Sequence, residues 1–221
     1  MPRPHEDLER HTPVDHRADG LPITFAPGTW CAIEIAHVAA ERAGAAISTY
    51  ETLIEKARAS SAKARSAAVF RSSNKRRVIA LVGLDGHEGY RHIKSAWDDH
   101  HLFAERHAVT ESGSLALYQV VASAGEVLID PASKEAYGFE RLAREPERVR
   151  KLIAPIVAAQ GFRGVFVFGA DDASASAILF RFGHSQDFDS FRASSAALDI
   201  LGPLNASGET AYTVHPVKTF V

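Results

Sequence analysis

The sequence predicts an α+β protein made of two tandem copies of one β-α-β-β-α-β unit. The first observation is the order of the elements, because β-rich alternating segments and amphipathic helical segments follow one another in the same order twice. The second is the spacing, since corresponding elements of the two halves lie roughly 100 residues apart. The third is that the strands are apolar on both faces, so each sheet needs helices on one side and a second cover on the other. This order is that of a ferredoxin-like unit with a four-stranded antiparallel sheet.

Composition and charge exclude several classes of protein. The chain has 221 residues, of which 46% are hydrophobic and 24% charged, as in ordinary globular proteins. A net charge of −2 gives no electrostatic reason to expect nucleic acid as a partner, and no apolar run reaches the roughly 20 residues of a membrane span. The single Cys31 cannot form an internal disulfide, and the N-terminus has no apolar core typical of a secretion signal. We therefore expect a cytoplasmic protein without a membrane partner.

The first half begins after a polar leader. Residues 1–29 contain five of the ten prolines and show no periodicity, which predicts a flexible N-terminal arm. The first unit is expected to cover residues 30–121. Its strands are predicted at 30–38, 66–72, 77–84 and 114–121, and its helices at 43–59 and 89–108.

The second half repeats this order after a linker at residues 122–135 that contains Gly125 and Pro131. A helix is predicted from Pro146 to Gln160, and Asp187 is the expected N-cap of the last helix. The unit is expected to cover residues 136–221, with strands at 136–143, 162–169, 176–183 and 209–216.

The segment 89–108 carries the most distinctive side chains. Residues that recur at steps of three and four share one face of a helix, and two histidines interrupt that apolar face beside a tryptophan. Such a histidine is either hydrogen-bonded at the edge of the core or serves as a ligand or base, and the pattern leaves both alternatives open. His100 and His107 lie about 10.5 Å apart along a straight helix, too far to bind one ion together, so no metal site is expected. The residues of this face are Tyr90, Ile93, Trp97, His100, Ala104 and His107.

The first strand contains two polar residues among apolar ones. Strand alternation places Glu34 and His37 on opposite faces of the sheet. Because both faces are largely apolar, a buried Glu34 needs a hydrogen-bonding partner or a cavity. Glu34 and His37 are thus either a cavity acid and a structural histidine, or two residues at exposed strand ends.

The chain resembles the antibiotic-biosynthesis-monooxygenase-like family, the dimeric α+β barrels, over residues 30–216. In the second half the resemblance lies in QGFRGVFVFG and the hairpin that leads into SAILFRFGHSQDFDSF. In the first half it lies in Trp97, Phe103 and His107, whose spacing W-x5-F-x3-H is similar to that of the heme-degrading branch, although the asparagine of that branch is absent from the first strand. The resemblance implies that one chain imitates the family dimer as a pseudo-dimeric α+β barrel. Its two sheets would pack face to face, with a cavity between each sheet and its helices.

The resemblance and the residues leave three functions open. The first is a small-molecule enzyme, a monooxygenase-like oxidoreductase without a bound cofactor, which oxidises an aromatic or enolic substrate in an apolar pocket of the first unit. The second is a heme-binding or heme-degrading protein in which His107 is the axial ligand and Trp97 the wall of the heme pocket. The third is a non-catalytic module that binds a small apolar or aromatic ligand, and a homodimer of the pseudo-dimer is also left open. The site residues expected for the first function are His107 and His100 for catalysis and Glu34, His37, Trp97 and Phe103 for substrate binding.

Overall fold

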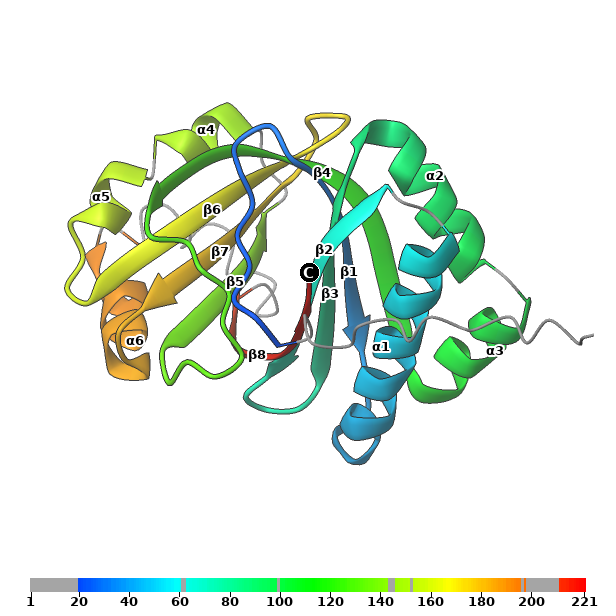
Figure 1. The fold of residues 1–221 in the computed structure, drawn as a ribbon. Coiled ribbons are helices and arrows are strands. Elements are labelled where there is room, and N and C mark those ends of the chain that lie inside the picture. Colours follow the sequence, from blue (N-terminus) through cyan, green and yellow to red (C-terminus); the bar gives the residue numbers. More distant parts are fainter. Residues whose placement is uncertain are drawn as a thin grey trace, which may run out of the picture.

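The fold is a closed eight-stranded barrel with helices on its outside (Figure 1). The computed structural model describes residues 20–60, 63–98, 100–142, 146–151, 153–195, 197 and 211–221. Around the barrel the strands follow the order β1-β3-β2-β8-β5-β7-β6-β4, and neighbouring strands are antiparallel. The α+β class predicted from the sequence is confirmed.

The first half contains every strand that the alternation predicts, within a few residues. The predicted helix 89–108 is instead two helices, because α2 ends at Trp97 and α3 begins at His100. The elements are β1 Trp30–His37, the short 3-10 helix η2 Ala40–Arg42, α1 Ala43–Ser60, β2 Ala64–Ser72, β3 Arg77–Leu84, α2 Gly86–Trp97, α3 His100–Val109 and β4 Ser112–Gly125.

The second half repeats the order of the strands, and its helices differ from the prediction in two places. The segment 146–160 forms two short helices, and the last helix begins at Ser185 after His184, so Asp187 lies in its first turn and is not the N-cap. The elements are β5 Ala136–Leu142, α4 Pro146–Arg150, α5 Ile153–Val157, β6 Phe162–Ala170, β7 Ser176–Phe182, α6 Ser185–Ala193 and β8 Ala211–Phe220.

The two halves are joined by strand pairing at both of their edges. Within the halves the strand orders are β4-β1-β3-β2 and β8-β5-β7-β6, the same ferredoxin-like order. β4 is long enough to pair with β1 through residues 112–119 and with β6 through residues 118–125, and β8 likewise connects β5 to β2. The predicted pseudo-dimeric α+β barrel is therefore confirmed, and strand pairing at both junctions joins the two sheets into one closed barrel wall.

The buried apolar side chains of the described residues form three cores. The barrel interior is filled by side chains of both halves, including Phe70, Tyr137 and Phe166. A second core lies between the first half and its helices α1 and α2, and a third between the second half and α5 and α6. Each strand thus buries both of its faces, which explains why the sequence is apolar on both.

Part of the expected N-terminal arm packs against the barrel. The segment 20–29 crosses the front of the barrel in Figure 1, where Ile23 pairs with Ile129 and Phe25 is buried in the barrel interior. Residues 1–19 of that expected arm lie outside the described residues. Among the helices that the structure describes, none is both long and apolar enough to cross a membrane.

Candidate functional site

The first functional side chain is a carboxyl group buried in the middle of β1. Glu34 is 2% exposed and shares its face of β1 with Ala32 and Ala36, which pack toward α1 and α2. The neighbouring strand makes room for it, because a Cβ atom on Gly113 would lie 2.8 Å from Glu34 Oε1. The alternation of β1 therefore places an ionisable group inside the outer core of the first half, where an unpaired charge is costly.

Two residues from different helices hold one oxygen of this carboxyl group. The hydroxyl of Tyr50, on α1, donates a hydrogen bond of 2.9 Å to Glu34 Oε1. The guanidinium of Arg106, on α3, lies 3.4 Å from the same oxygen. Glu34 Oε2 has no hydrogen-bonding partner among the described residues. One acceptor of the buried carboxyl group is thus left for a molecule from outside.

A tryptophan next to this group contributes an unpaired donor. Trp97, at the end of α2, is fully buried and packs edge-on against Tyr50, with ring centroids 6.0 Å apart. Within the described part of the chain its indole Nε1 has no acceptor. An unpaired acceptor on Glu34 and an unpaired donor on Trp97 therefore flank the same tyrosine. Because buried polar groups are nearly always paired, this is the composition of a binding site for a small polar group.

Glu34, Tyr50, Trp97 and Arg106 together form the Glu34 cluster. Its electrostatics favour a carboxyl group that binds its proton more tightly than usual. Burial raises the pKa of Glu34, and the positive charge of Arg106 and the hydrogen bond from Tyr50 oppose this rise. Burial and the charge of Glu34 also raise the pKa of the Tyr50 hydroxyl, which therefore stays protonated as a donor. A carboxylate with a raised pKa is a stronger base than an exposed one.

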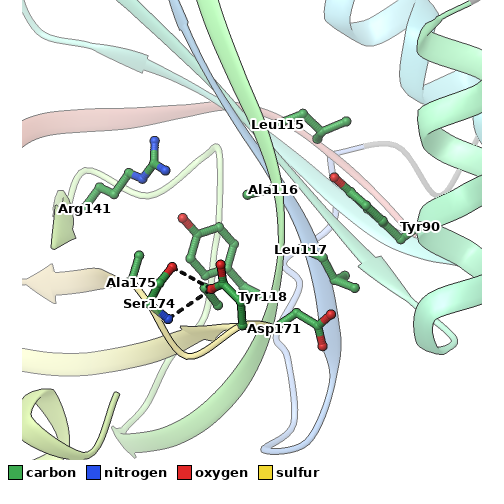
Figure 2. A pocket seen from close by; sticks show the side chains of 11 residues that line it. Tyr90, Leu115, Ala116, Leu117, Tyr118, Arg141, Asp171, Ser174 and Ala175 are labelled. Carbon is green, nitrogen blue, oxygen red and sulfur yellow. Dashed lines mark hydrogen bonds between the residues drawn. The ribbon is translucent and has the colours of Figure 1, made fainter. Parts of the chain in front are cut away.

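A cavity of about 310 Å³ lies at the edge of β4 (Figure 2). In the described part of the chain, β4 pairs with β6 only from Tyr118 onward, so residues 112–117 pair on one side alone. Figure 2 shows Tyr90 of α2 on one side of β4 and Arg141 of β5 on the other. Burial and the charges of Asp98 and Glu34 raise the pKa of Tyr90. Tyr90 therefore lines the cavity and lies close enough to Glu34 for the charge of the carboxyl group to affect its hydroxyl group.

A second cavity of about 590 Å³ lies at the far end of β1. It is polar, and His37 lies in its wall, half-buried. His37 is therefore not brought together with Glu34, as strand alternation predicts for two residues on opposite faces. Residues of the first half alone line this cavity, namely His37, Val38, Ala39, Ala40, Glu41, Asn74, Arg76, Arg77 and Glu111.

Of the two predicted catalytic histidines, His107 does not join the Glu34 cluster. Helix α2 ends at Trp97, with Asp98 as its C-cap. The following helix, α3, therefore does not continue the face of α2 on which Trp97 lies. His107 is exposed on α3, whereas its neighbour Arg106 turns inward with a side chain 16% exposed. The side chains of His100 and Phe103 lie outside the described residues. The single apolar stripe predicted over residues 89–108 is therefore wrong, because one helix period cannot extend through the break.

Sequence reasoning also missed two partners of Glu34. Tyr50 lies in the helix predicted at 43–59, on the face that is buried against the sheet, where its hydroxyl group pairs with Glu34. A buried glutamate on a strand that packs against this face was a signal for that pair. Arg106 gave no such signal, because its inward direction depends on the helix break.

The described residues offer little to a metal ion or heme. They contain no group of three or more histidine, cysteine, aspartate or glutamate side chains placed to hold a metal. Heme would require His107 and Trp97 to face one pocket, but His107 is exposed and Trp97 is enclosed in the core behind α2. This pair does not fit the ligand and wall of a heme site.

Comparison with known proteins supports the fold. No protein-family model matches the sequence, and no curated protein matches it by sequence similarity. An anthrone oxidase-like protein has a similar structure, with a TM-score of 0.67 and 13% identity over 89% of this chain and 97% of that chain. A putative monooxygenase from Fusobacterium nucleatum has a TM-score of 0.57 and 8% identity, over 89% of this chain and 95% of its own. A putative monooxygenase from Lactobacillus acidophilus has a TM-score of 0.54 and 6% identity, over 88% of this chain and 96% of its own. The chain therefore shares its fold with these three proteins, while the cytoplasmic location and the homodimer stay predictions.

Proposed function

We propose, from this shared fold and the buried Glu34 cluster, that the chain is a monooxygenase-like enzyme that oxidises an aromatic or enolic substrate with dioxygen. The observation that carries the proposal is the pair of unpaired buried atoms, Glu34 Oε2 and Trp97 Nε1, in the first half. A substrate whose oxygen accepts a hydrogen bond, and which carries an acidic proton nearby, satisfies both atoms. Glu34 replaces the histidines as the proposed base.

The reaction begins with the transfer of a proton to Glu34 Oε2. An activated CH₂ group that is conjugated with a carbonyl loses this proton and becomes an enolate, whose electrons reduce dioxygen. Overall, R₂CH₂ and O₂ give R₂C=O and H₂O, so the substrate supplies all four electrons and one oxygen atom enters the product. The protein contributes a base that is buried in the outer core of the first half, where the anion is protected from protonation by solvent.

The other residues of the cluster position and stabilise these charges. Tyr50 and Arg106 hold Glu34 Oε1, so the carboxyl group cannot turn away from the substrate. The indole N–H of Trp97 donates to the oxygen that gains negative charge in the enolate. The cavity next to Tyr90 is the proposed route by which the substrate reaches Glu34.

Anthrone is a suitable test substrate, because it carries an acidic CH₂ group next to a carbonyl-conjugated ring system and one structural neighbour is described as anthrone oxidase-like. Purified protein is mixed with anthrone in air-saturated buffer, and oxygen consumption and anthraquinone absorbance are followed. We expect Glu34→Gln to lower turnover by about 100-fold or more, since a positioned base contributes that much. The rate of the unaltered protein should rise with pH through the raised pKa of Glu34, and this rise should disappear in the variant.

Glu105→Gln, an exposed change on α3, serves as the matched control and should leave the rate unchanged. Full activity in folded Glu34→Gln would overturn the proposed role of the carboxyl group. Binding of anthrone without any oxygen consumption would overturn the enzymatic function and support the binding module instead.

A further inference from the structure

A half-buried arginine on β5 reaches across to β4, a strand with which β5 does not pair. Alternation along β5 places Tyr137 and Arg141 on the barrel face and the buried Glu140 on the outer face. The guanidinium of Arg141 donates a hydrogen bond of 3.0 Å to Ser114 Oγ on β4. Within the described residues its partners are neutral hydroxyl groups and no carboxylate. The positive charge of Arg141 is therefore not neutralised by an ion pair in this part of the chain.

A buried tyrosine is the second neutral partner of this arginine. Tyr118 on β4 is 2% exposed, and its hydroxyl group forms a hydrogen bond with the guanidinium of Arg141. Burial raises the pKa of Tyr118 and the charge of Arg141 opposes the rise, so the hydroxyl group stays protonated. A hydroxyl oxygen that accepts from Arg141 still has its own proton to donate, and a guanidinium has about five N–H donors. The pair therefore offers several donors and a positive charge to a further group.

These donors line the cavity of about 310 Å³ at the edge of β4 (Figure 2). The backbone of β4 adds a donor on the same side. The N–H of Asp171 donates to the carbonyl of Leu117 at 3.1 Å, so Leu117 turns its polar backbone groups away from β1. The N–H of Leu115, two residues earlier, points the same way, where β4 has no strand partner among the described residues. The rest of the wall is largely apolar and consists of Tyr90, Leu115, Ala116, Leu117, Ala170 and Ala175.

Two aspartates of the β6–β7 turn also line the cavity, and both have partners of their own. Asp172 Oδ1 accepts hydrogen bonds from the backbone N–H and the hydroxyl group of Ser174, at 3.0 and 2.6 Å. Asp171 Oδ1 lies 3.3 Å from His87 Nε2 of α2. Both carboxylates are exposed, so solvent screens their charges, whereas the guanidinium of Arg141 is half-buried. This balance favours a single negative charge beside Arg141 and disfavours a ligand with several.

We propose that this cavity is a binding site for a singly charged carboxylate with a flat apolar body. Arg141 binds the carboxylate with two N–H donors, and the hydroxyl group of Tyr118 and the N–H of Leu115 donate to the same group. The apolar body lies against Leu117 and the ring of Tyr90. Both halves form the site, because β4 and α2 belong to the first half and β5 and the β6–β7 turn to the second. It shares no residue with the Glu34 cluster.

Isothermal titration with 2-naphthoate tests this proposal, and 2-naphthamide is the matched neutral probe. We expect one site per chain for 2-naphthoate and at least about tenfold weaker binding of 2-naphthamide, because a charge-assisted hydrogen bond becomes a neutral one. Arg141→Met should weaken 2-naphthoate at least about tenfold and affect 2-naphthamide much less. Arg141→Lys keeps the charge without the planar fork, so its loss should be smaller. Tyr118→Phe keeps the ring and should weaken 2-naphthoate by roughly threefold or more.

Arg76→Met, an exposed change at the β2–β3 turn beside the larger polar cavity, is the matched control variant and should bind 2-naphthoate normally. Loss of binding in Arg76→Met instead of Arg141→Met would place the acid in that other cavity and overturn the proposal. The same holds for absent binding, for equal affinity of the two probes, and for unchanged binding in Arg141→Met and Tyr118→Phe, whose melting temperatures verify folding. The titrations require no turnover, so a failure of the oxidation proposed for Glu34 leaves their result standing.

Discussion

Replacing Glu140 by glutamine should make the protein more stable at high pH and leave it unchanged at low pH. Burial raises the pKa of this carboxyl group from 4.5 to about 7. The folded state therefore binds the proton more tightly than the unfolded state does. The contribution of this group to stability is fully present below about pH 4.5 and is lost as the pH rises through about 7. Glutamine cannot ionise, so the variant avoids this loss.

The expected magnitude follows from the size of the pKa change. Each pKa unit corresponds to about 1.4 kcal/mol. A rise of the pKa from 4.5 to about 7 therefore lowers the free energy of unfolding by about 3 kcal/mol between acid and alkaline pH. For a chain of this length, 1 kcal/mol moves the melting temperature by roughly 2–4 °C. We therefore expect Glu140→Gln to melt roughly 6–12 °C higher than the unaltered protein above pH 8, and at nearly the same temperature near pH 5.

Urea unfolding of both proteins at pH values from 5 to 9 measures this difference directly. The free energy of unfolding of the variant minus that of the unaltered protein should grow steadily with pH and level off above about 8. Glu105→Gln, the exposed change on α3, should give a difference that does not vary with pH. A pH-independent difference for Glu140→Gln would show that the buried carboxyl group is solvated or paired, and would refute the reasoning.

Three further predictions concern the first half. Tyr50→Phe removes the donor to Glu34 and should lower the free energy of unfolding by about 1–3 kcal/mol, as measured in urea. The loss should be larger at pH 8 than at pH 5, because the hydrogen bond stabilises the charged carboxylate, and an equal loss at both would contradict this. Trp97→Phe keeps a buried ring without the N–H group, so anthrone turnover should fall about 100-fold, and the melting temperature, which the smaller ring should lower, verifies that the variant still folds. His107→Ala removes an exposed side chain and should leave anthrone turnover unchanged, while a Soret band that appears with hemin and vanishes in this variant would restore the heme alternative.

The sequence by itself determined the strands and the repeated order of the two units. Strand alternation is a local property, because each residue reports which face of its own strand is buried. It placed Glu34 on the face opposite His37, and it predicted that both faces of the strands would be covered. The strand AYGFERL also contains Glu140. Its sequence did not reveal that this glutamate is buried without a hydrogen-bonding partner among the described residues.

Only the tertiary structure decided how the halves join and which side chains meet. The pairings of β4 with β6 and of β8 with β2 link residues far apart in the chain, and local periodicity carries no information about such partners. The end of α2 at Trp97 was hidden by a helical pattern that continues through it. That break leaves His107 exposed and turns Arg106 toward Glu34. The composition of the site therefore depends on the direction of α3. This direction is determined by the packing of α3 against α1, which the spacing of residues in the sequence does not reveal.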